Sequence, residues 1–153
     1  MSPTDFTAQT PDFEQRVRDS FAKQGAMHHV GVRMDSVQPG RVTLSVPMRP
    51  EVSQQHGFMH GGILSLALDT ACGYAALSLM PADSGVLTIE FKINFVAPAR
   101  GQRVRLVGQV LKPGRTITVV EGRACAVDGE REKLCATMVA TMMTVSGRDD
   151  IRN

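Results

Sequence analysis

One stretch of the chain combines residue types that could do chemistry together: the glycine pair Gly61 and Gly62, followed by the acidic residue Asp69. From Ile63 to Met80 the residues are almost all apolar, and Asp69 is the only charge. An ionised carboxylate in such surroundings is disfavoured unless it is paired, hydrogen-bonded or neutralised by a raised pKa. Enzymes keep general bases and nucleophiles in environments of that kind. Asp69 is therefore either a catalytic carboxylate or a buried acid satisfied by water or by a hydroxyl such as that of Thr70.

The two glycines suit another part of the same chemistry. If a helix begins at Gly61, its first N–H groups have no acceptor inside the helix and lie at the positive end of the helix dipole. Without side chains to block approach, they can stabilise a carbonyl oxygen that acquires negative charge, as in an oxyanion hole. A tight turn that merely requires glycine is the alternative.

The spacing of these groups leads to a prediction about assembly. Gly61 and Asp69 are eight residues apart, which is about 12 Å along a helix axis. An oxyanion donor and a catalytic carboxylate must both lie within about 3 Å of the same reacting group, so one copy of the helix cannot supply both. The sequence therefore predicts a homodimer with two composite sites, in which Gly61 of one subunit faces Asp69 of the other.

The element that must position these residues is a helix from Gly61 to Met80, roughly 30 Å long. It has no polar face, so the rest of the protein must enclose it. A membrane span of this length is disfavoured by about 2.5 to 3.5 kcal/mol for the central Asp69, and no Lys or Arg flanks the segment closely. We therefore predict a buried helix and no membrane partner.

The flanking sequence predicts a short helix and about six strands. A helix start at Thr10-Pro11 and a glycine stop at Gly25 bracket an amphipathic segment. The loop that follows, Met27 to His29, has paired histidines without the further ligands of a metal site. Alternating apolar residues predict strands at Val30 to Met34, Val42 to Met48, Leu87 to Phe95, Gln102 to Leu111, Thr116 to Val127 and Glu132 to Val145.

These elements predict an α+β fold: an antiparallel sheet of about six strands wrapped around one long buried helix, plus a short N-terminal helix. We expect a single domain over residues 1–153, with flexible tails at 1–9 and 146–153.

The composition argues against several other classes of protein. A net charge of +2, 5% aromatic residues and no Trp are unlike a nucleic-acid binder, which concentrates basic charge and stacking rings. The cysteines Cys72, Cys125 and Cys135 are odd in number and widely spaced, so we expect neither a metal site nor a full disulfide framework. They suit a reducing compartment, and Met1 to Gln9 lacks a signal-peptide pattern, so we expect a cytoplasmic protein.

The motif Gly57-Phe58-Met59-His60-Gly61-Gly62, the later Asp69 and the strand Thr88 to Phe95 with Pro98-Ala99 resemble the hotdog-fold thioesterases. The most similar branch is the phenylacetyl-CoA thioesterase-like group, and the resemblance covers about Gly31 to Val145. It implies a hotdog fold and hydrolysis of an acyl-CoA or aryl-CoA thioester. It also implies a homodimer or a dimer of dimers, and no cofactor other than the coenzyme A of the substrate.

The resemblance assigns roles to individual residues. Asp69 matches the catalytic carboxylate, which acts as general base on water or as direct nucleophile. Gly61 matches the backbone donor to the thioester carbonyl, His60 the histidine that orders the loop, and Thr88 a hydroxyl that positions the water. The family commonly has Asn six residues before the His. Here that position is Gln54, with Gln55 beside it, so a longer amide must take the role.

The substrate-binding residues are expected around these groups. An apolar acyl pocket and the oxyanion end would include Phe58, Met59, Gly62, Leu68 and Cys72, whereas the coenzyme A phosphates would contact cations such as Lys112, Arg115, Arg100 and Arg103. The alternative for the cations is a solvated hairpin surface. The sequence does not distinguish an aryl from a fatty acyl group.

Three other interpretations remain open. Cys72 lies three residues after Asp69 and could be a nucleophile, although small helical cysteines usually just pack. A hotdog dehydratase would pair His56 with Asp69 across the dimer and turn over a 3-hydroxyacyl or enoyl thioester without releasing thiol. The related hydratases have His five residues after the Asp. This chain has Tyr74 at that position, which argues against the hydratase branch. A non-catalytic module would bind acyl-CoA without hydrolysis.

Overall fold

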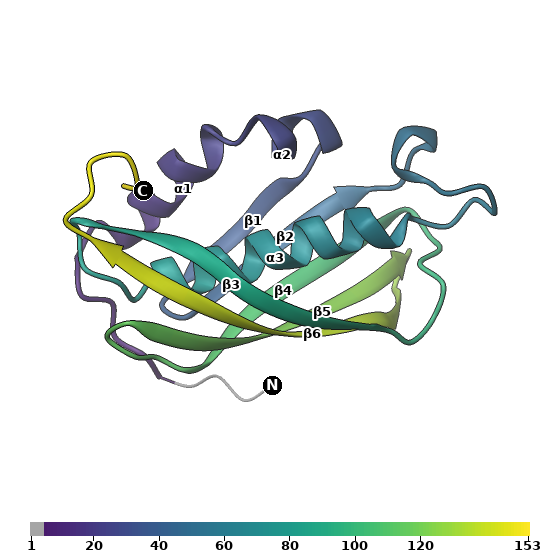
Figure 1. Ribbon diagram of the computed structural model, residues 1–153. Coiled ribbons are helices and arrows are strands. Elements are labelled where there is room, and N and C mark those ends of the chain that lie inside the picture. Colours follow the sequence, from purple (N-terminus) through teal and green to yellow (C-terminus); the bar gives the residue numbers. More distant parts are fainter. Residues whose placement is uncertain (1–4) are drawn as a thin grey trace.

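The computed structural model describes residues 5–153 and confirms the predicted α+β architecture, a six-stranded antiparallel sheet that curves around one long helix (Figure 1). The strands follow the order β1-β2-β4-β5-β6-β3 across the sheet. The helices are α1 (Phe13–Ala22), α2 (Gly25–Val30), the 3-10 helix η1 (Pro50–Val52) and α3 (Gly61–Leu77). The strands are β1 (Arg33–Gln38), β2 (Arg41–Pro47), β3 (Ser84–Phe95), β4 (Arg103–Lys112), β5 (Ile117–Asp128) and β6 (Arg131–Ser146).

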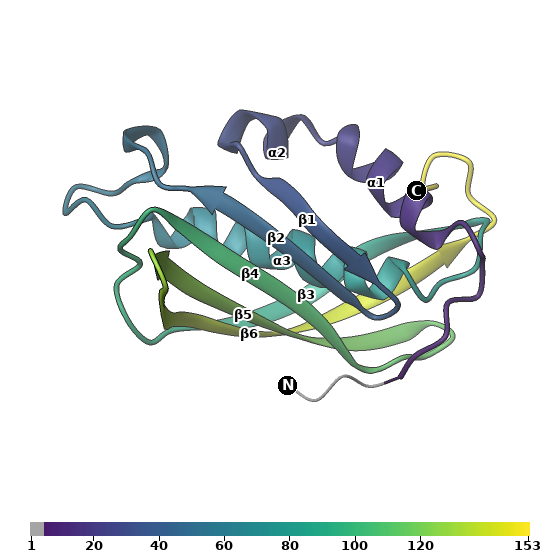
Figure 2. The same cartoon turned by 180° about the vertical axis from the view of Figure 1, so that it is seen from behind.

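Helix α3 lies between the α1–α2 pair and strands β5 and β6, as Figure 1 and the reverse view in Figure 2 both show. It begins at Gly61, as predicted, and ends at Leu77, before the predicted Met80. Two carbonyls just beyond this end accept hydrogen bonds from the N-terminal region. Gln9 Nε2 donates to the carbonyl of Leu79 at 2.8 Å, and a guanidinium nitrogen of Arg16 donates to that of Met80 at 3.1 Å. The segment that follows α3 is therefore held in place by residues distant in sequence, whereas the last helical turn is capped locally by Ser78.

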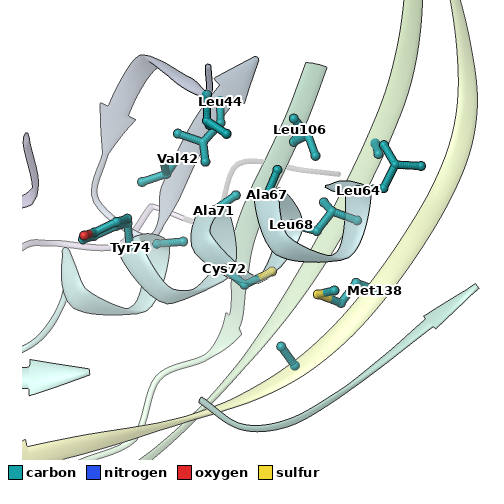
Figure 3. Close-up of a cluster of buried hydrophobic side chains, with 14 of the residues drawn as sticks. Val42, Leu44, Leu64, Ala67, Leu68, Ala71, Cys72, Tyr74, Leu106 and Met138 are labelled. Atoms are coloured by element: carbon teal, nitrogen blue, oxygen red, sulfur yellow. The ribbon is translucent and has the colours of Figure 1, made fainter. Parts of the chain in front are cut away.

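The sheet-facing side of α3 forms the core together with the inner faces of the strands (Figure 3). Leu68, Ala71 and Cys72 are fully buried there. The helix approaches β4 so closely that a Cβ at Gly108 would lie 2.4 Å from the carbonyl oxygen of Ala71. Glycine is therefore required at residue 108 for this packing. No helix within residues 5–153 is long and apolar enough to cross a membrane.

The N-terminal region differs from the prediction. Helix α1 begins at Phe13, after Asp12 rather than after Thr10. Gly25 does not end the helical region: it is the first residue of α2, so the predicted loop at Met27 to His29 is wrong. Val30 is the last residue of that helix and not part of a strand. The true stop is Gly31, whose φ of 81° gives the left-handed C-cap that glycine favours.

Strand β3 forms an edge of the sheet and leaves large apolar side chains uncovered. Leu87, Ile89, Phe91 and Phe95 are exposed, with Ile89 at 50% and Phe95 at 54%. Within residues 5–153, β3 pairs only with β6, so the other side of this 12-residue strand offers free backbone groups beyond the N–H of Val86, which is hydrogen-bonded to Asn153. Long apolar edges of this kind are ready to pair with another chain.

Both segments predicted as tails make contacts where the structure describes them. Residues 1–4 lie outside the described part of the chain. Phe6 packs against the core, and Asn153 bridges two elements: its Oδ1 accepts from the N–H of Val86 and its Nδ2 donates to Ser20 Oγ. The sequence did not predict these contacts.

Candidate active site

Asp69 lies in the middle of α3 on the side that faces β3. It is half-buried, and Thr88 Oγ1 donates a hydrogen bond to its Oδ1 at 2.7 Å. Burial raises the pKa of the Asp69 carboxyl, and the hydrogen bond from Thr88 opposes that rise because it stabilises the ionised form. The pair predicted from sequence is therefore in contact, with a carboxylate suited to accept a proton.

A small cavity of about 160 Å³ opens beside Asp69. Besides Asp69 and Thr88, it is lined by Thr70, Gly73, Val86 and three polar residues that no sequence motif indicated: Gln24, Tyr74 and Asn153. Tyr74 accepts from Gln24 Nε2 at 2.8 Å and shares a hydrogen bond with Ser20 Oγ at 3.0 Å. The part of the cavity that is lined by Gln24 and Tyr74 is therefore polar.

Gly61 presents the donor that an oxyanion requires. His60 occupies the N-cap position of α3, and its Nδ1 accepts from the N–H of Gly62 at 2.8 Å. Its carbonyl accepts from the N–H groups of Ile63 and Leu64. Among the described residues, no acceptor is found for the N–H of Gly61. The histidine therefore orders the helix start, which leaves Gly61 rather than Gly62 as the available donor.

The loop before α3 is organised by Gln54. Its Oε1 accepts from the backbone N–H groups of His56 and Phe58, so only its amide NH₂ remains for a substrate. Gln54, Phe58, Met59 and Gly61 line one cavity of about 370 Å³. The ring of Phe95 closes on the same point, 3.0 Å from where a Cβ on Gly61 would be. A side chain at residue 61 would displace this ring.

The chain therefore has two half-sites. The cavity with Gly61 and Gln54 and the cavity with Asp69 and Thr88 share no lining residue. Their separation follows from the eight-residue spacing along a straight helix, about 12 Å. Within one subunit the oxyanion donor and the carboxylate do not meet.

Several predicted substrate contacts lie elsewhere. Leu68 and Cys72 are 0% exposed and face Gly122 of β5, so the prediction that they line the acyl pocket is wrong. Burial also raises the pKa of the Cys72 thiol far above its usual range, which disfavours a nucleophilic thiolate. Lys112 and Arg115 are exposed at the β4–β5 turn, and Arg115 lines a different cavity.

Two further residues bear on the alternatives. His56 is exposed in the loop before α3, 6.3 Å from the ring of Phe58, while Asp69 lies two turns into the helix. The guanidinium of Arg100 stacks 4.3 Å from the Phe58 ring centre, at the cavity that contains Gly61. Arg100 therefore lies beside the oxyanion half-site.

The antiparallel sheet wrapped around one long helix is the hotdog fold, and comparisons with known proteins give the family. Residues 56–133 match the model of the thioesterase superfamily. A thioesterase family protein from Silicibacter pomeroyi is 51% identical, with a TM-score of 0.85 over 87% of this chain and 98% of that one. The 1,4-dihydroxy-2-naphthoyl-CoA hydrolase of Listeria monocytogenes is 24% identical, over 72% of this chain and 87% of that one.

The chain belongs to the thioesterase superfamily, and we assign it as a thioester hydrolase. The E. coli PaaI protein from the phenylacetic acid degradation operon has the same fold, with a TM-score of 0.78 over 87% of this chain and 93% of that one. At 19% identity this likeness extends to the fold alone.

Proposed function

We propose that this protein is an acyl-CoA thioesterase that hydrolyses its substrate to a free acid and coenzyme A. The observation that carries the proposal is the pair of half-sites, a carboxylate with its hydroxyl partner and a helix-start N–H without an acceptor. These are the two groups that thioester hydrolysis requires. Their separation within one chain supports a site shared between two subunits.

In the proposed mechanism, the thioester carbonyl accepts hydrogen bonds from the N–H of Gly61 and the amide of Gln54 of one subunit. Asp69 of the other subunit takes a proton from a water that Thr88 helps to position, and the resulting hydroxide attacks the carbonyl carbon. The C–S bond then breaks and the thiolate leaves. It needs little assistance, because thiol pKa values lie near 8.5, so the proton on Asp69 can return to solvent. Direct attack by Asp69 would give the same products through an anhydride.

The uncovered face of β3 supports the homodimer. Apolar side chains from Leu87 to Phe95 flank both half-sites and have no cover within the described chain. A second copy that pairs along the free edge of β3 would bury them and bring each Gly61 toward the other subunit's Asp69. A dimer of dimers would be built from the same unit.

The cavity beside Asp69 bears on the acyl group. The polar side chains of Gln24, Tyr74 and Asn153 in its lining favour an acyl group with polar substituents over a long alkyl chain. An aryl-CoA, as in the phenylacetyl-CoA branch and as the name of the Listeria relative states for that enzyme, is the substrate class that we propose.

Thiol release tests the proposal. Wild-type protein, Asp69→Asn and the exposed control Asp128→Asn are assayed with a panel of aryl-CoA and alkyl-CoA thioesters. We expect release of coenzyme A by the wild type and the control. Asp69→Asn should lose about 10²- to 10⁴-fold, the usual contribution of a general base. Equal rates for wild type and Asp69→Asn would remove Asp69 from the mechanism, and binding without thiol release would indicate a non-catalytic module.

A further inference from the structure

A cavity larger than those of the two half-sites lies outside both of them, at the C-terminal end of α3. Its volume is about 530 Å³, within the range of small-ligand pockets. The end of α3, the β4–β5 turn and the end of β6 meet there (Figure 1). None of its lining residues lines the cavities that contain Gly61 or Asp69.

One wall of this cavity is apolar. Ala76 near the end of α3, and Leu79 and Met80 just after it, belong to the buried core and line the cavity together with Pro81. The carbonyls of Leu79 and Met80 are already hydrogen-bonded by Gln9 and Arg16. This wall therefore offers an apolar surface to a ligand and few free polar groups.

The opposite wall carries hydrogen-bonding groups and a positive charge. Arg115 comes from the β4–β5 turn, and Thr118 and Thr144 come from β5 and β6. The N–H of Thr144 donates to the carbonyl of Thr116 at 2.8 Å, which places Thr144 beside the residue that follows Arg115. Thr144 Oγ1 is buried and has no hydrogen-bond partner within residues 5–153. An unpartnered buried hydroxyl is unfavourable unless a ligand or water satisfies it.

We propose that this cavity binds a carboxylic acid with an apolar body. The body packs against Ala76, Leu79 and Met80, and the carboxylate accepts hydrogen bonds from Arg115 and from the hydroxyl of Thr144. The orientation follows from electrostatics: the C-terminal end of α3 carries partial negative charge, so the carboxylate lies at the side of the β4–β5 turn. The binding step does not depend on the thioesterase activity, although the acid released by that reaction belongs to the same chemical class.

Calorimetric titration tests the site with sodium octanoate and, as the uncharged counterpart, octan-1-ol. The wild type should bind both. In Arg115→Gln the affinity for octanoate should fall about five- to tenfold while that for octanol stays unchanged, because one charge-assisted hydrogen bond is lost. Thr144→Val, a side chain of similar shape, should lower the affinity for octanoate by a smaller factor. Arg131→Gln, at the other end of β6, is the matched control and should bind both ligands as the wild type does.

Two further variants fix the place of binding. Leu79→Ala removes part of the apolar wall and should weaken the binding of both ligands, and its thermal unfolding checks that it is folded. Asp69→Asn should bind octanoate as the wild type does, because octanoate in the acyl cavity would respond to that change instead.

The proposal is overturned if the wild type does not bind octanoate or if Arg115→Gln binds it unchanged. It is also overturned if Arg115→Gln weakens only the binding of coenzyme A, because that result would assign Arg115 to the substrate phosphates.

Discussion

Two inactive variants should restore each other's activity if each site is shared between subunits. Asp69→Asn removes the carboxylate, and Gly61→Pro removes the N–H at the first residue of α3. Proline is favoured at that helical position. His60, with φ −62° and ψ 136°, already has the extended conformation that a residue before proline requires. The nearest side chain is the ring of Phe95, 3.0 Å from the position of the new Cβ, so thermal unfolding and gel filtration must show that the variant folds and dimerises.

The expected recovery follows from the geometry of a two-fold dimer. Each subunit gives its Asp69 to one site and its Gly61 to the other. In a heterodimer of the two variants, one site therefore has both changes and the other has neither, so about half of the wild-type activity per dimer should return. The parent homodimers have no intact site. Losing an oxyanion donor costs about 2.7 to 4 kcal/mol, or about 10²- to 10³-fold in rate, so the recovered activity lies far above the background.

The assay uses co-expression with two different tags, purification through both tags, and measurement of thiol release from one aryl-CoA thioester. The matched control is the heterodimer of Gly61→Pro with Gln54→Ala. Both of those changes lie in the same half-site, so each of its two sites contains one defect and little activity should return. If the heterodimer of Asp69→Asn with Gly61→Pro is pure, folded and still inactive, the reasoning from helix length is refuted.

Three other predictions follow from single contacts. Thr88→Val removes a hydrogen bond that lowers the pKa of Asp69, so burial alone should then set a higher pKa. The acid limb of the pH profile of kcat/KM should therefore move to higher pH. An unchanged limb would show that Thr88 does not act on the carboxylate. Cys72→Ala should keep its thioesterase activity, because burial raises the pKa of this thiol, and complete loss in a folded variant would revive the cysteine as nucleophile. Gly108→Ala should lower the free energy of unfolding by about 1 to 3 kcal/mol, because its Cβ would lie 2.4 Å from the carbonyl oxygen of Ala71. The midpoint of urea unfolding measures this change. An unchanged midpoint would mean that α3 can shift away.

The helical and strand elements were largely predictable because their signals are local. Alternation of apolar residues located the strands, and the glycine pair located the start of α3 at Gly61. Gly25 shows the limit of such signals, since the same residue type can end one helix or begin the next. Here Met27 and Val30 pack into the core, and this packing favours the short helix α2 over a loop. Tertiary contacts therefore outweighed the local stop signal.

The arrangement of the candidate site was predictable where its residues share one element or one motif. Asp69, Gly61 and His60 are positioned by a single helix, so their spacing in sequence fixes their spacing in space. The direction of the neighbouring side chains was not fixed in that way. Leu68 and Cys72 flank Asp69 in the sequence, yet both face β5 in the core, because only the sheet decides which side of an all-apolar helix is covered.

The sequence by itself determined the elements, the helix that carries the acid and the distance that keeps its donor and carboxylate apart. These depend on backbone geometry and on periodicity over a few residues. Only the tertiary structure brought Thr88 to Asp69 and placed Asn153 at the same cavity. It also placed Arg115 at a different cavity, beyond the end of α3. Such contacts join residues from separate elements, and they depend on how the sheet curves around the helix, which no local pattern encodes.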